Sequence, residues 1–280
     1  MSQGDVAVVI AARNEEGSIT QVLAALEGQT LPPRLVVVVD DGSTDGTAQV
    51  LSQFRSAIFV LSVVGLPHHE VSYVGRPELA GVFNAGLAAI RESNPVPEFV
   101  MILGGDHVLP RDYLAKIVAR MKADPMLAIA GGWIAGEPYL EDVPRGSSML
   151  VRTSFWEQAS GMRYPRRYGW ESWLYLKAMK EGFRTRSFKD VPTSVSRQTS
   201  TTKGILYGRA MYSLGYYWPY AVGRSFLFAL RSPKAGVKVL AGYLGHQGVE
   251  RQDVADWVGQ RQQRILARRA LRIASRLGRS

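Results

Sequence analysis

Short apolar runs alternate with amphipathic segments along most of this 280-residue chain. Continuous apolar runs of strand length, bounded by polar residues or glycine, predict buried strands. They occupy residues 6–11, 35–39, 58–64, 99–103, 127–133 and 147–152. Apolar residues at helical spacing follow several of these runs, over residues 19–26, 48–54, 77–92, 111–122 and 170–181. This alternation predicts an α/β fold with a mostly parallel sheet and crossover helices.

One stretch, FVMILGGDHVLP at residues 99–110, carries the most chemical information. Its apolar run fits a central strand that is covered on both faces and ends at Gly104-Gly105. Carboxyl ends of such strands commonly carry ligand-binding groups, and glycines there allow a ligand to approach the backbone closely. Asp106 follows and could hold a divalent cation on a diphosphate. The alternative is a strand-to-loop turn with a solvated aspartate.

Two polar loops follow the first two predicted strands, at residues 13–18 and 40–47. Because carboxyl ends of neighbouring parallel strands meet at one edge of a sheet, we expect these loops to lie together. We expect Asp40 or Asp41 to contact a base or ribose, since two adjacent acids exceed what a turn needs. Helix capping is the alternative for the residues that follow, Ser43, Thr44 and Asp45, and Ser18 is a candidate cap for the helix at 19–26.

Three further positions each allow two interpretations. Arg76, at the start of the helix over 77–92, could meet a phosphate or simply be solvated. The pair His68-His69 lies in a predicted loop and is more typical of a surface segment than of a metal site, because no third ligand is near in sequence. Glu171 lies in the first turn of the helix over 170–181, where it suits the helix dipole or could act as a general base in a cleft. Gly182 fits the position just after that helix.

The character of the chain changes near residue 200, so we expect one domain over residues 1–200 and a helical extension over 201–280. Residues 204–230 are rich in aromatic side chains and fit either a membrane interface or a docking face for another helix. Residues 261–280 combine recurring arginines with one apolar stripe. This pattern is typical of a basic helix that lies in a bilayer interface, and a terminal helix packed on the domain is the alternative.

Charge and composition narrow the classes of function. The net charge is +10, and from Arg231 onward 11 basic residues face 3 acidic ones. A basic surface suits an anionic partner. No nucleic-acid-binding motif, Walker loop, nucleophile elbow or spaced His/Cys cluster accompanies it, so we expect no nucleic acid. The chain has no cysteine. The first residues do not read as a signal peptide, and no stretch predicts a membrane span.

Several of these segments together resemble the family 2 glycosyltransferases with the GT-A fold. They are VVIAARNEEGSI (8–19), VVVVDDGSTDGT (36–47), Asn84-Ala85-Gly86, ILGGDHVLPRDYL (102–114) and GWESWLYLKAMKEGF (169–183). They follow the order and spacing of the family over roughly the first 200 residues. The C-terminal region resembles that of bacterial and archaeal members that build cell-surface or lipid-linked glycans.

The resemblance implies transfer of a sugar from a nucleotide-diphosphate donor with inversion at the anomeric carbon. Ala11, Arg13 and Glu15 would line the nucleoside pocket, and Asp40 and Asp41 would approach the base. Asp106 would bind Mg²⁺ or Mn²⁺ on the diphosphate. We expect Gly105 and Arg76 to join the nucleotide site, and His107 to ligate the metal, support it from behind or contact the diphosphate. Glu171 and Ser172 would lie near the acceptor.

This sequence departs from the family pattern at two acids. Gly104 replaces the first Asp of the Asp-x-Asp motif, and Ser172 replaces the Asp that usually serves as the catalytic base. Serine is a poor base at neutral pH, so either Glu171 substitutes for it or the acceptor is already an anion, such as a lipid phosphate. Three functions stay open: an active transferase, a degenerate GT-A protein acting as a binding or assembly subunit, and a sugar-nucleotide pyrophosphorylase. The last is disfavoured because Arg-Asn-Glu-Glu follows the first strand in place of a glycine-rich phosphate loop.

The expected partners follow from these interpretations. They are a nucleotide-sugar donor, a glycan or lipid-phosphate acceptor, a membrane surface and, as an open point, a second copy of the chain. We expect a cytoplasmic protein at the inner face of the cell membrane.

Overall fold

The computed structural model describes residues 5–195 and 204–277, with side chains described as far as residue 269. The chain divides into two compact units, which are taken one at a time below. The first comprises Met1–Ser72, Leu79–Tyr164 and Lys177–Gln198, and the second comprises Tyr73–Glu78, Pro165–Leu176 and Thr199–Ser280. The second unit therefore contains two short segments from the region expected to form the first domain. The division into a domain over residues 1–200 and a helical extension over 201–280 stays a prediction.

The first unit is built on a sheet that, within the described residues, has eight strands in the order β3-β2-β1-β4-β7-β6-β8-β5. The strands are β1 Val6–Ala12, β2 Leu35–Asp40, β3 Val60–Gly65, β4 Phe99–Gly104, β5 His107–Val108, β6 Leu127–Ile134, β7 Leu150–Arg152 and β8 Arg184–Val195. The first four in the spatial order are mutually parallel, and β7 is antiparallel to both of its neighbours. The predicted α/β class is confirmed.

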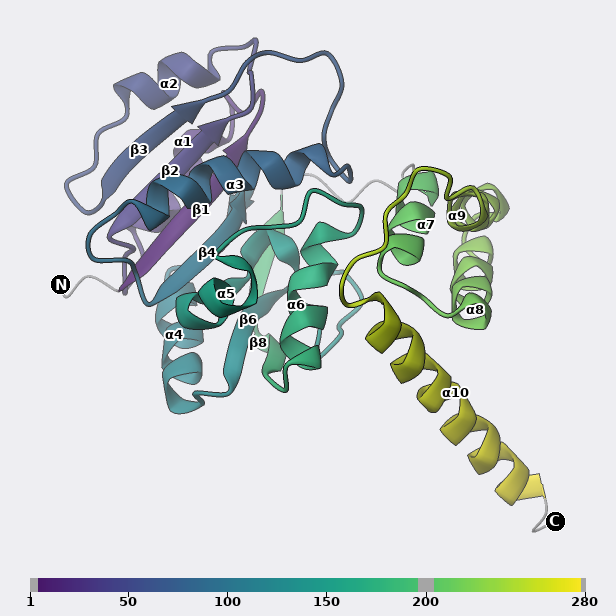
Figure 1. Cartoon of the computed structure of the whole chain (residues 1–280). Helices are drawn as coiled ribbons and strands as arrows, with labels where there is room; N and C mark the ends of the chain where they lie inside the picture. The colour runs from purple at the N-terminus through teal and green to yellow at the C-terminus, as the bar shows by residue number, and fades with distance from the viewer. Residues whose placement is uncertain (1–4, 196–203, 278–280) are drawn as a thin grey trace. The chain divides into compact units, whose positions relative to one another are not determined.

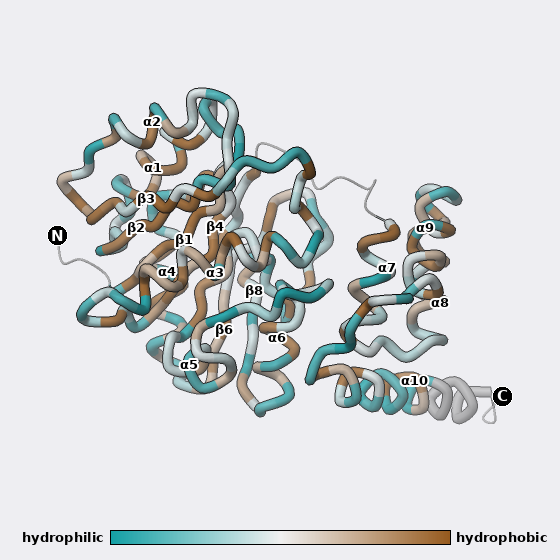
Figure 2. The backbone as a smooth tube through the Cα atoms, turned by 45° about the horizontal axis from the view of Figure 1, so that its top comes forward, coloured by the Kyte–Doolittle hydropathy of each residue, from teal (hydrophilic) through white to brown (hydrophobic). Residues whose placement is uncertain are grey.

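Helices cover both faces of this sheet (Figure 1). Alternate strand residues such as Val8 and Ile10 form one core with α1 Ile19–Glu27, α2 Thr47–Gln53 and α4 Tyr113–Ala123. Helix α3 (Glu78–Arg91) packs on the opposite face, where Gly86 lies against the side chains of Val9 and Val39. Burial on both faces explains why β1, β2 and β4 are continuously apolar, as the brown colour along them in Figure 2 shows.

Helix α5 (Thr153–Ser160) and the strands β5 and β8 of the first unit were not predicted. The third strand begins two residues later than expected, at Val60. Gly182 follows α6 (Trp170–Lys180) with a φ of +85°, and Phe183 N donates to Ala178 O, so the predicted helix end is confirmed. Ser18 occupies the N-cap position of α1, as predicted, but its side chain makes no capping hydrogen bond to this helix.

The second unit consists mainly of helices: α7 Gly204–Ser213, α8 Trp218–Ala229, α9 Pro233–Leu244 and α10 Ala255–Leu277. Helices α7 and α9 touch backbone to backbone. A Cβ built on Gly208 would meet Val239 O at 2.1 Å, and one on Gly242 would meet Ile205 O at 2.1 Å. The small core around Met211, Ala221 and Val239 is completed by aromatic side chains, namely Tyr207, Tyr216, Phe228 and Tyr243.

Helix α10 includes most of the segment expected to form a basic amphipathic helix. Arg264, Arg268 and Arg269 are exposed, and Leu266 is half-buried. The rest of the expected apolar stripe, Ala270, Ile273, Ala274 and Leu277, lies outside the residues whose side chains the structure describes. Within the described part of the chain, we find no helix with the length and apolar character that a bilayer crossing requires.

Replacing Gly86 tests the close packing of α3 on the sheet. A Cβ at this position would lie 2.5 Å from Val9 Cγ1 and 2.9 Å from Val39 Cγ2. We expect Gly86→Ala to lower the free energy of unfolding by about 1–3 kcal/mol, measured by urea denaturation. Gly223→Ala is the control in another helix interior with open space around it, and it should be neutral or stabilising by up to about 1 kcal/mol. Equal effects of the two substitutions would contradict this packing.

Candidate functional site

The carboxyl ends of β1, β2, β3 and β4 lie level with one another. Ala12 pairs with Asp40, Ala11 pairs with Gly104, and Asp40 pairs with Gly65. Neighbouring strands are about 4.8 Å apart, so the loops that follow them meet at one edge of the sheet. In open α/β sheets this edge is where ligands bind. The predicted meeting of the two polar loops is confirmed by the contacts described next.

Hydrogen bonds join the loop after β1 to the loop after β2. Asn14 N donates to Ser43 Oγ at 3.0 Å, and Thr44 N donates to Asn14 Oδ1 at 2.9 Å. Farther along, Glu15 N donates to Thr47 Oγ1 at 2.8 Å. Asp45 accepts from the backbone of Glu16 and of Thr47, which begins α2. Gly46 occupies the N-cap position of α2, so Asp45 does not cap this helix as an N-cap residue, although its carboxylate accepts from the first helical residue. The same bonds hold the loop that carries Asp40 and Asp41.

The two adjacent acids at the end of β2 are both buried, but they do different things. Asp40 Oδ1 accepts from Ser43 N at 3.0 Å and closes the local turn. Asp41 Oδ1 lies 3.0 Å from His69 Nε2. Burial raises the pKa of Asp41, and the hydrogen bond and positive charge of His69 and the charge of Arg13 partly offset that rise. Contact of either acid with a base or ribose stays a prediction, and Asp41 is the one whose carboxylate connects different loops.

Arg13, in the loop after β1, completes a three-residue network. Its Nη1 lies 2.9 Å from His69 Nδ1 and donates to Val71 O at 3.1 Å, while its Nη2 donates to His69 O. His69 therefore links Asp41 to Arg13, a role that the surface-loop interpretation of the tandem histidines missed. The available signal was position, because the loop that carries His69 follows β3, the strand beside β2. His68 is exposed and lies 3.2 Å from Glu70.

The loop after β1 is also tied to the end of β4. Ser18 Oγ lies 2.5 Å from Glu15 Oε2 and donates to Gly105 O at 3.1 Å. Gly105 has no room for a side chain, because an added Cβ would lie 3.0 Å from Glu15 Cγ and 3.2 Å from Ala11 O. The glycine thus lets the two loops approach closely, and the predicted approach of a ligand to its backbone stays a prediction. Three of the expected nucleotide residues, Ala11, Glu15 and Gly105, are brought together here.

Asp106 follows this close contact and is half-buried. An added Cβ on Gly104 would lie 3.3 Å from Asp106 Oδ1, which is a tight contact, so the glycine at the position of the missing family acid lets this carboxylate lie close to the backbone. The described residues contain no group of three or more His, Asp or Glu side chains arranged for a metal. One carboxylate fits an ion such as Mg²⁺ that takes its other ligands from phosphate and water, so the residues present fit that mode of binding.

His107 is fully buried, and its Nδ1 lies 3.3 Å from Ser147 Oγ. Burial lowers the pKa of His107 to about 4, although the charge of Asp106 acts in the opposite direction. The ring is therefore neutral at pH 7. Complete burial favours a supporting role behind Asp106 over direct ligation, and the metal-ligand assignment of His107 stays untested.

Arg76, Glu171 and Ser172 belong to the second unit. The carbonyl of Arg76 accepts from Trp170 Nε1 at 3.2 Å, which anchors the start of α6. Ser172 hydrogen-bonds to Tyr175, whose pKa is raised by burial and lowered again by this bond and by the charge of Arg224. Arg224 Nε in turn donates to Tyr207 Oη at 3.0 Å. Glu171 and Ser172 thus adjoin a cluster of tyrosines around one half-buried arginine.

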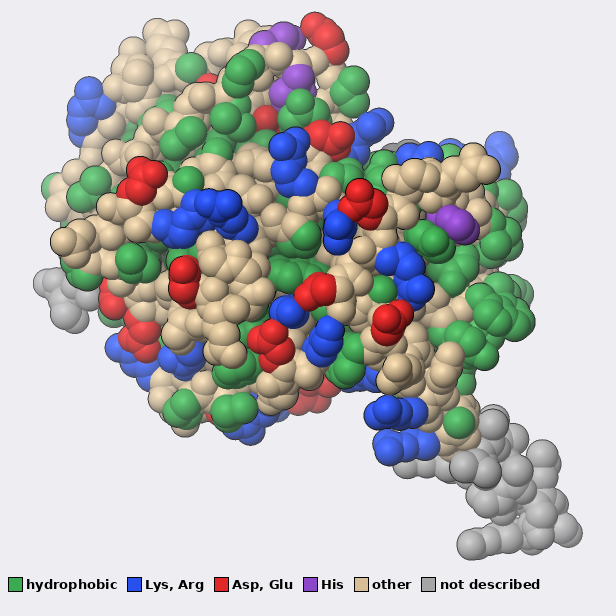
Figure 3. All heavy atoms as spheres, viewed as in Figure 1, with side chains coloured by type: hydrophobic (Ala, Val, Ile, Leu, Met, Phe, Trp, Pro, Cys, Tyr) green, Lys and Arg blue, Asp and Glu red, His purple; other side chains and the backbone are tan. Residues whose placement is uncertain are grey.

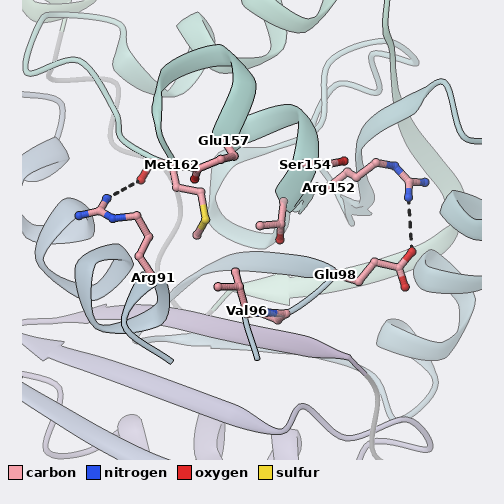
Figure 4. Close-up of a pocket in the computed structure, with 9 residues that line it drawn as sticks. Arg91, Val96, Glu98, Arg152, Ser154, Glu157 and Met162 are labelled. Atoms are coloured by element: carbon pink, nitrogen blue, oxygen red, sulfur yellow. Dashed lines mark hydrogen bonds and ion pairs between the residues drawn. The ribbon is translucent and has the colours of Figure 1, made fainter. Parts of the chain in front are cut away.

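A cavity of about 640 Å³ lies elsewhere in the first unit (Figure 4). It adjoins the start of β4 and the start of α5, so it lies at the sheet edge opposite the loops described above. Its cations already have partners: Arg152 pairs with Glu98, and Arg91 donates to the carbonyls of Gly161 and Met162. This cavity is therefore not the candidate site.

Comparison with known proteins now gives the class of the chain. It matches the sequence model of glycosyl transferase family 2 over residues 7–191, so the chain belongs to that family. The predicted resemblance is confirmed. A curated relative, poly-beta-1,6-N-acetyl-D-glucosamine synthase of Staphylococcus epidermidis, is 24% identical over 155 residues. That match covers 55% of this chain and 33% of the synthase, so the aligned part spans about a third of the relative's length.

Solved structures share the fold at low sequence identity. The mannosyltransferase PcManGT from Pyrobaculum calidifontis, in complex with GDP-Man and Mn²⁺, gives a TM-score of 0.60 at 19% identity, with 95% of this chain and 81% of that chain covered. S. aureus TarS 1-349 in complex with UDP-GlcNAc gives a TM-score of 0.53 at 18% identity, with 72% and 64% covered. These likenesses support the GT-A form of the α/β fold.

The network around Asp41 generates a stability prediction. His69→Ala leaves a buried carboxylate without its nearest partner, so we expect the free energy of unfolding at pH 7 to fall by about 1–3 kcal/mol. His68→Ala is the neighbouring control and should change it by less than about 0.5 kcal/mol, because His68 is exposed. Urea denaturation measures both variants. A larger loss for His68→Ala than for His69→Ala would contradict the assigned network.

Proposed function

We propose that this family 2 protein transfers a sugar from a nucleotide-diphosphate donor to a glycan or lipid-linked acceptor, with inversion at the anomeric carbon. The observation that carries the proposal is the edge of the sheet where β1, β2, β3 and β4 end, which we call the strand-end edge of the first unit. There the network of Asp41, His69 and Arg13 and the carboxylate of Asp106 follow neighbouring strands of one parallel sheet. The nucleotide sugars bound by similar structures support a donor of this class.

In the proposed mechanism the first unit binds the donor. Asp41 accepts hydrogen bonds from the base or ribose, and Arg13 and Glu15 frame the nucleoside beside Ala11. Gly105 lets the loop after β1 and the end of β4 approach each other closely, so that both can border the diphosphate. Asp106 would hold Mg²⁺ or Mn²⁺, and such an ion would offset the charge that develops on the leaving nucleoside diphosphate. Buried His107 fixes the segment that carries Asp106.

The acceptor is best explained as an anion. Ser172 stands where a catalytic carboxylate is usual in the family, and its hydroxyl bonds to Tyr175. Arg224 carries a positive charge near these residues, and its Nε donates to Tyr207 Oη. A phosphate acceptor needs no base to remove a proton and would be attracted by this arginine. We therefore favour a lipid phosphate over a neutral sugar hydroxyl, acting at the inner face of the cell membrane.

A second candidate function is a binding or assembly subunit without turnover. Gly104 and Ser172, each in place of an acid, favour it. The presence of Asp41, Arg13 and Asp106 at the strand-end edge favours the enzyme. Hydrolysis of a nucleotide sugar in the absence of acceptor distinguishes the two, since only the enzyme would release the nucleoside diphosphate.

Asp106→Asn tests the role assigned to that carboxylate. We expect Mn²⁺ to bind in the presence of the matching nucleoside diphosphate, and the substitution to weaken that binding by about tenfold or more, because a hard cation loses its charged protein ligand. Electron paramagnetic resonance of free Mn²⁺ measures it. Asp112→Asn is the control, since Asp112 pairs with Lys116 on the surface. Unchanged Mn²⁺ affinity in the Asp106 variant would remove Asp106 from the site.

A pair of substitutions separates the two kinds of acceptor. With a phosphate acceptor, Glu171→Gln should retain kcat within about threefold, whereas Arg224→Gln should raise the KM for the acceptor about tenfold or more and leave donor hydrolysis intact. With a neutral hydroxyl acceptor, loss of a general base would reduce kcat by roughly 10²–10⁴-fold in Glu171→Gln. Steady-state transfer assays distinguish these patterns, and the second one would make Glu171 the base.

A further inference from the structure

The outward face of α8 is more apolar than its inward face. Trp218, Val222, Phe226 and Leu230 recur every four residues from the start of the helix to its C-cap, so they share one side. All four are exposed, and Phe226 and Leu230 are 62% and 68% exposed. Leu227 extends the same surface. The inward side carries Ala221 and Ser225, both buried, and one large apolar side chain, Phe228, which packs in the small core. A helix that served only the protein core would turn its large apolar side chains inward.

Helix α9 continues this surface. Gly236 packs against Ser225 O and Ala229, so the two helices lie side by side. Val237 and Leu244 of α9 are also exposed. Figure 3 shows hydrophobic side chains gathered over α8 and α9, which Figure 1 labels. The core of this unit is filled without them, by Tyr207, Tyr216, Phe228 and Tyr243. We call this surface, Trp218, Val222, Phe226, Leu227, Leu230, Val237 and Leu244, the α8–α9 apolar face.

Cations border the α8–α9 apolar face. Arg231 and Lys234 lie at the junction between the two helices, and Lys238 lies one turn farther along α9. All three are exposed. In the part of the chain that the structure describes, no carboxylate comes within ion-pair distance of them. An apolar face with an unbalanced cationic rim suits a surface of anionic head groups over hydrocarbon.

The charge also argues against a second copy of the chain as the occupant. A symmetric dimer through this surface would bring the same patch of each subunit together, including both sets of cations. The tryptophan at the edge of the face is a residue type that is enriched at the boundary between head groups and hydrocarbon.

We propose that the α8–α9 apolar face docks on an anionic bilayer, with its apolar side chains in the interface and Arg231, Lys234 and Lys238 on lipid phosphates. This deepens the proposed function, because it brings the chain to the surface where a lipid-linked acceptor resides. Docking needs no nucleotide sugar, so it can be tested separately from transfer.

The chain has no cysteine, so single reporters can be introduced cleanly. We expect Phe226→Cys, labelled with a polarity-sensitive nitrobenzoxadiazole dye, to shift its emission to the blue on vesicles of phosphatidylcholine with phosphatidylglycerol. Nitroxide-labelled lipid should quench it. Val60→Cys is the matched control, because Val60 is 66% exposed on β3, and it should show neither effect. A response confined to lipid-free protein at rising concentration would mean self-association and would overturn the proposal.

Co-sedimentation with the same vesicles supplies the second test. In the double variant Phe226→Asp, Leu230→Asp, the ratio of vesicle-bound to free protein should fall about tenfold or more. The triple variant Arg231→Gln, Lys234→Gln, Lys238→Gln should lose the preference for anionic lipid. Val60→Asp should bind as the unmodified chain does. If binding persists in both α8–α9 variants and disappears in Arg264→Gln with Arg268→Gln and Arg269→Gln, helix α10 is the contact and the proposal fails. Absence of vesicle binding by the unmodified chain would also overturn it, and neither result depends on transfer.

Discussion

A carboxylate buried at the end of β2 constrains how the loops of the first unit can be arranged. Asp41 is almost inaccessible to water, so its charge requires a partner within the protein. His69 supplies that partner from the loop after β3, and Arg13 contacts the same imidazole from the loop after β1. One buried charge thereby ties together the loops that follow three strands. Ser18 and Gly105 connect the loop after β1 to the end of β4.

This arrangement explains why the two adjacent acids are not equivalent. Asp40 closes its own turn through Ser43 N, so its role is largely local. Asp41 instead depends on His69 and Arg13, whose contacts offset the cost of burying its charge. A ligand that offers hydrogen-bond donors to this carboxylate would add to a site whose loops are already held in place. Preorganisation of this kind lowers the cost of ordering the protein on binding.

The sequence predicted correctly those elements that depend on residues close together in the chain. Continuous apolar runs located β1, β2 and β4, and the glycine pattern located the end of α6 at Gly182. The sequence did not predict side-chain roles that depend on contacts between residues far apart in the chain. The hydroxyl of Ser18 bonds to Glu15 and Gly105 instead of capping α1, and His69 became important only because β3 lies beside β2.

Strand β8 alternates buried and exposed residues and carries a proline, Pro192, so no continuous apolar run marks it. The aromatic region at 204–230 allowed two interpretations. Its tyrosines pack in the core of the second unit, as a docking face for another helix would, while Trp218 and Phe226 are exposed, and the membrane interface stays a proposal.

The central claim is that the strand-end edge of the first unit binds a nucleoside diphosphate together with a divalent ion. Thermal unfolding of the unmodified chain with UDP, GDP or dTDP, each with and without Mn²⁺, tests it most directly. The account predicts that at least one nucleotide raises Tm and that Mn²⁺ increases this shift. If none of the three changes Tm at millimolar concentration, with or without the metal, the account of this site is contradicted.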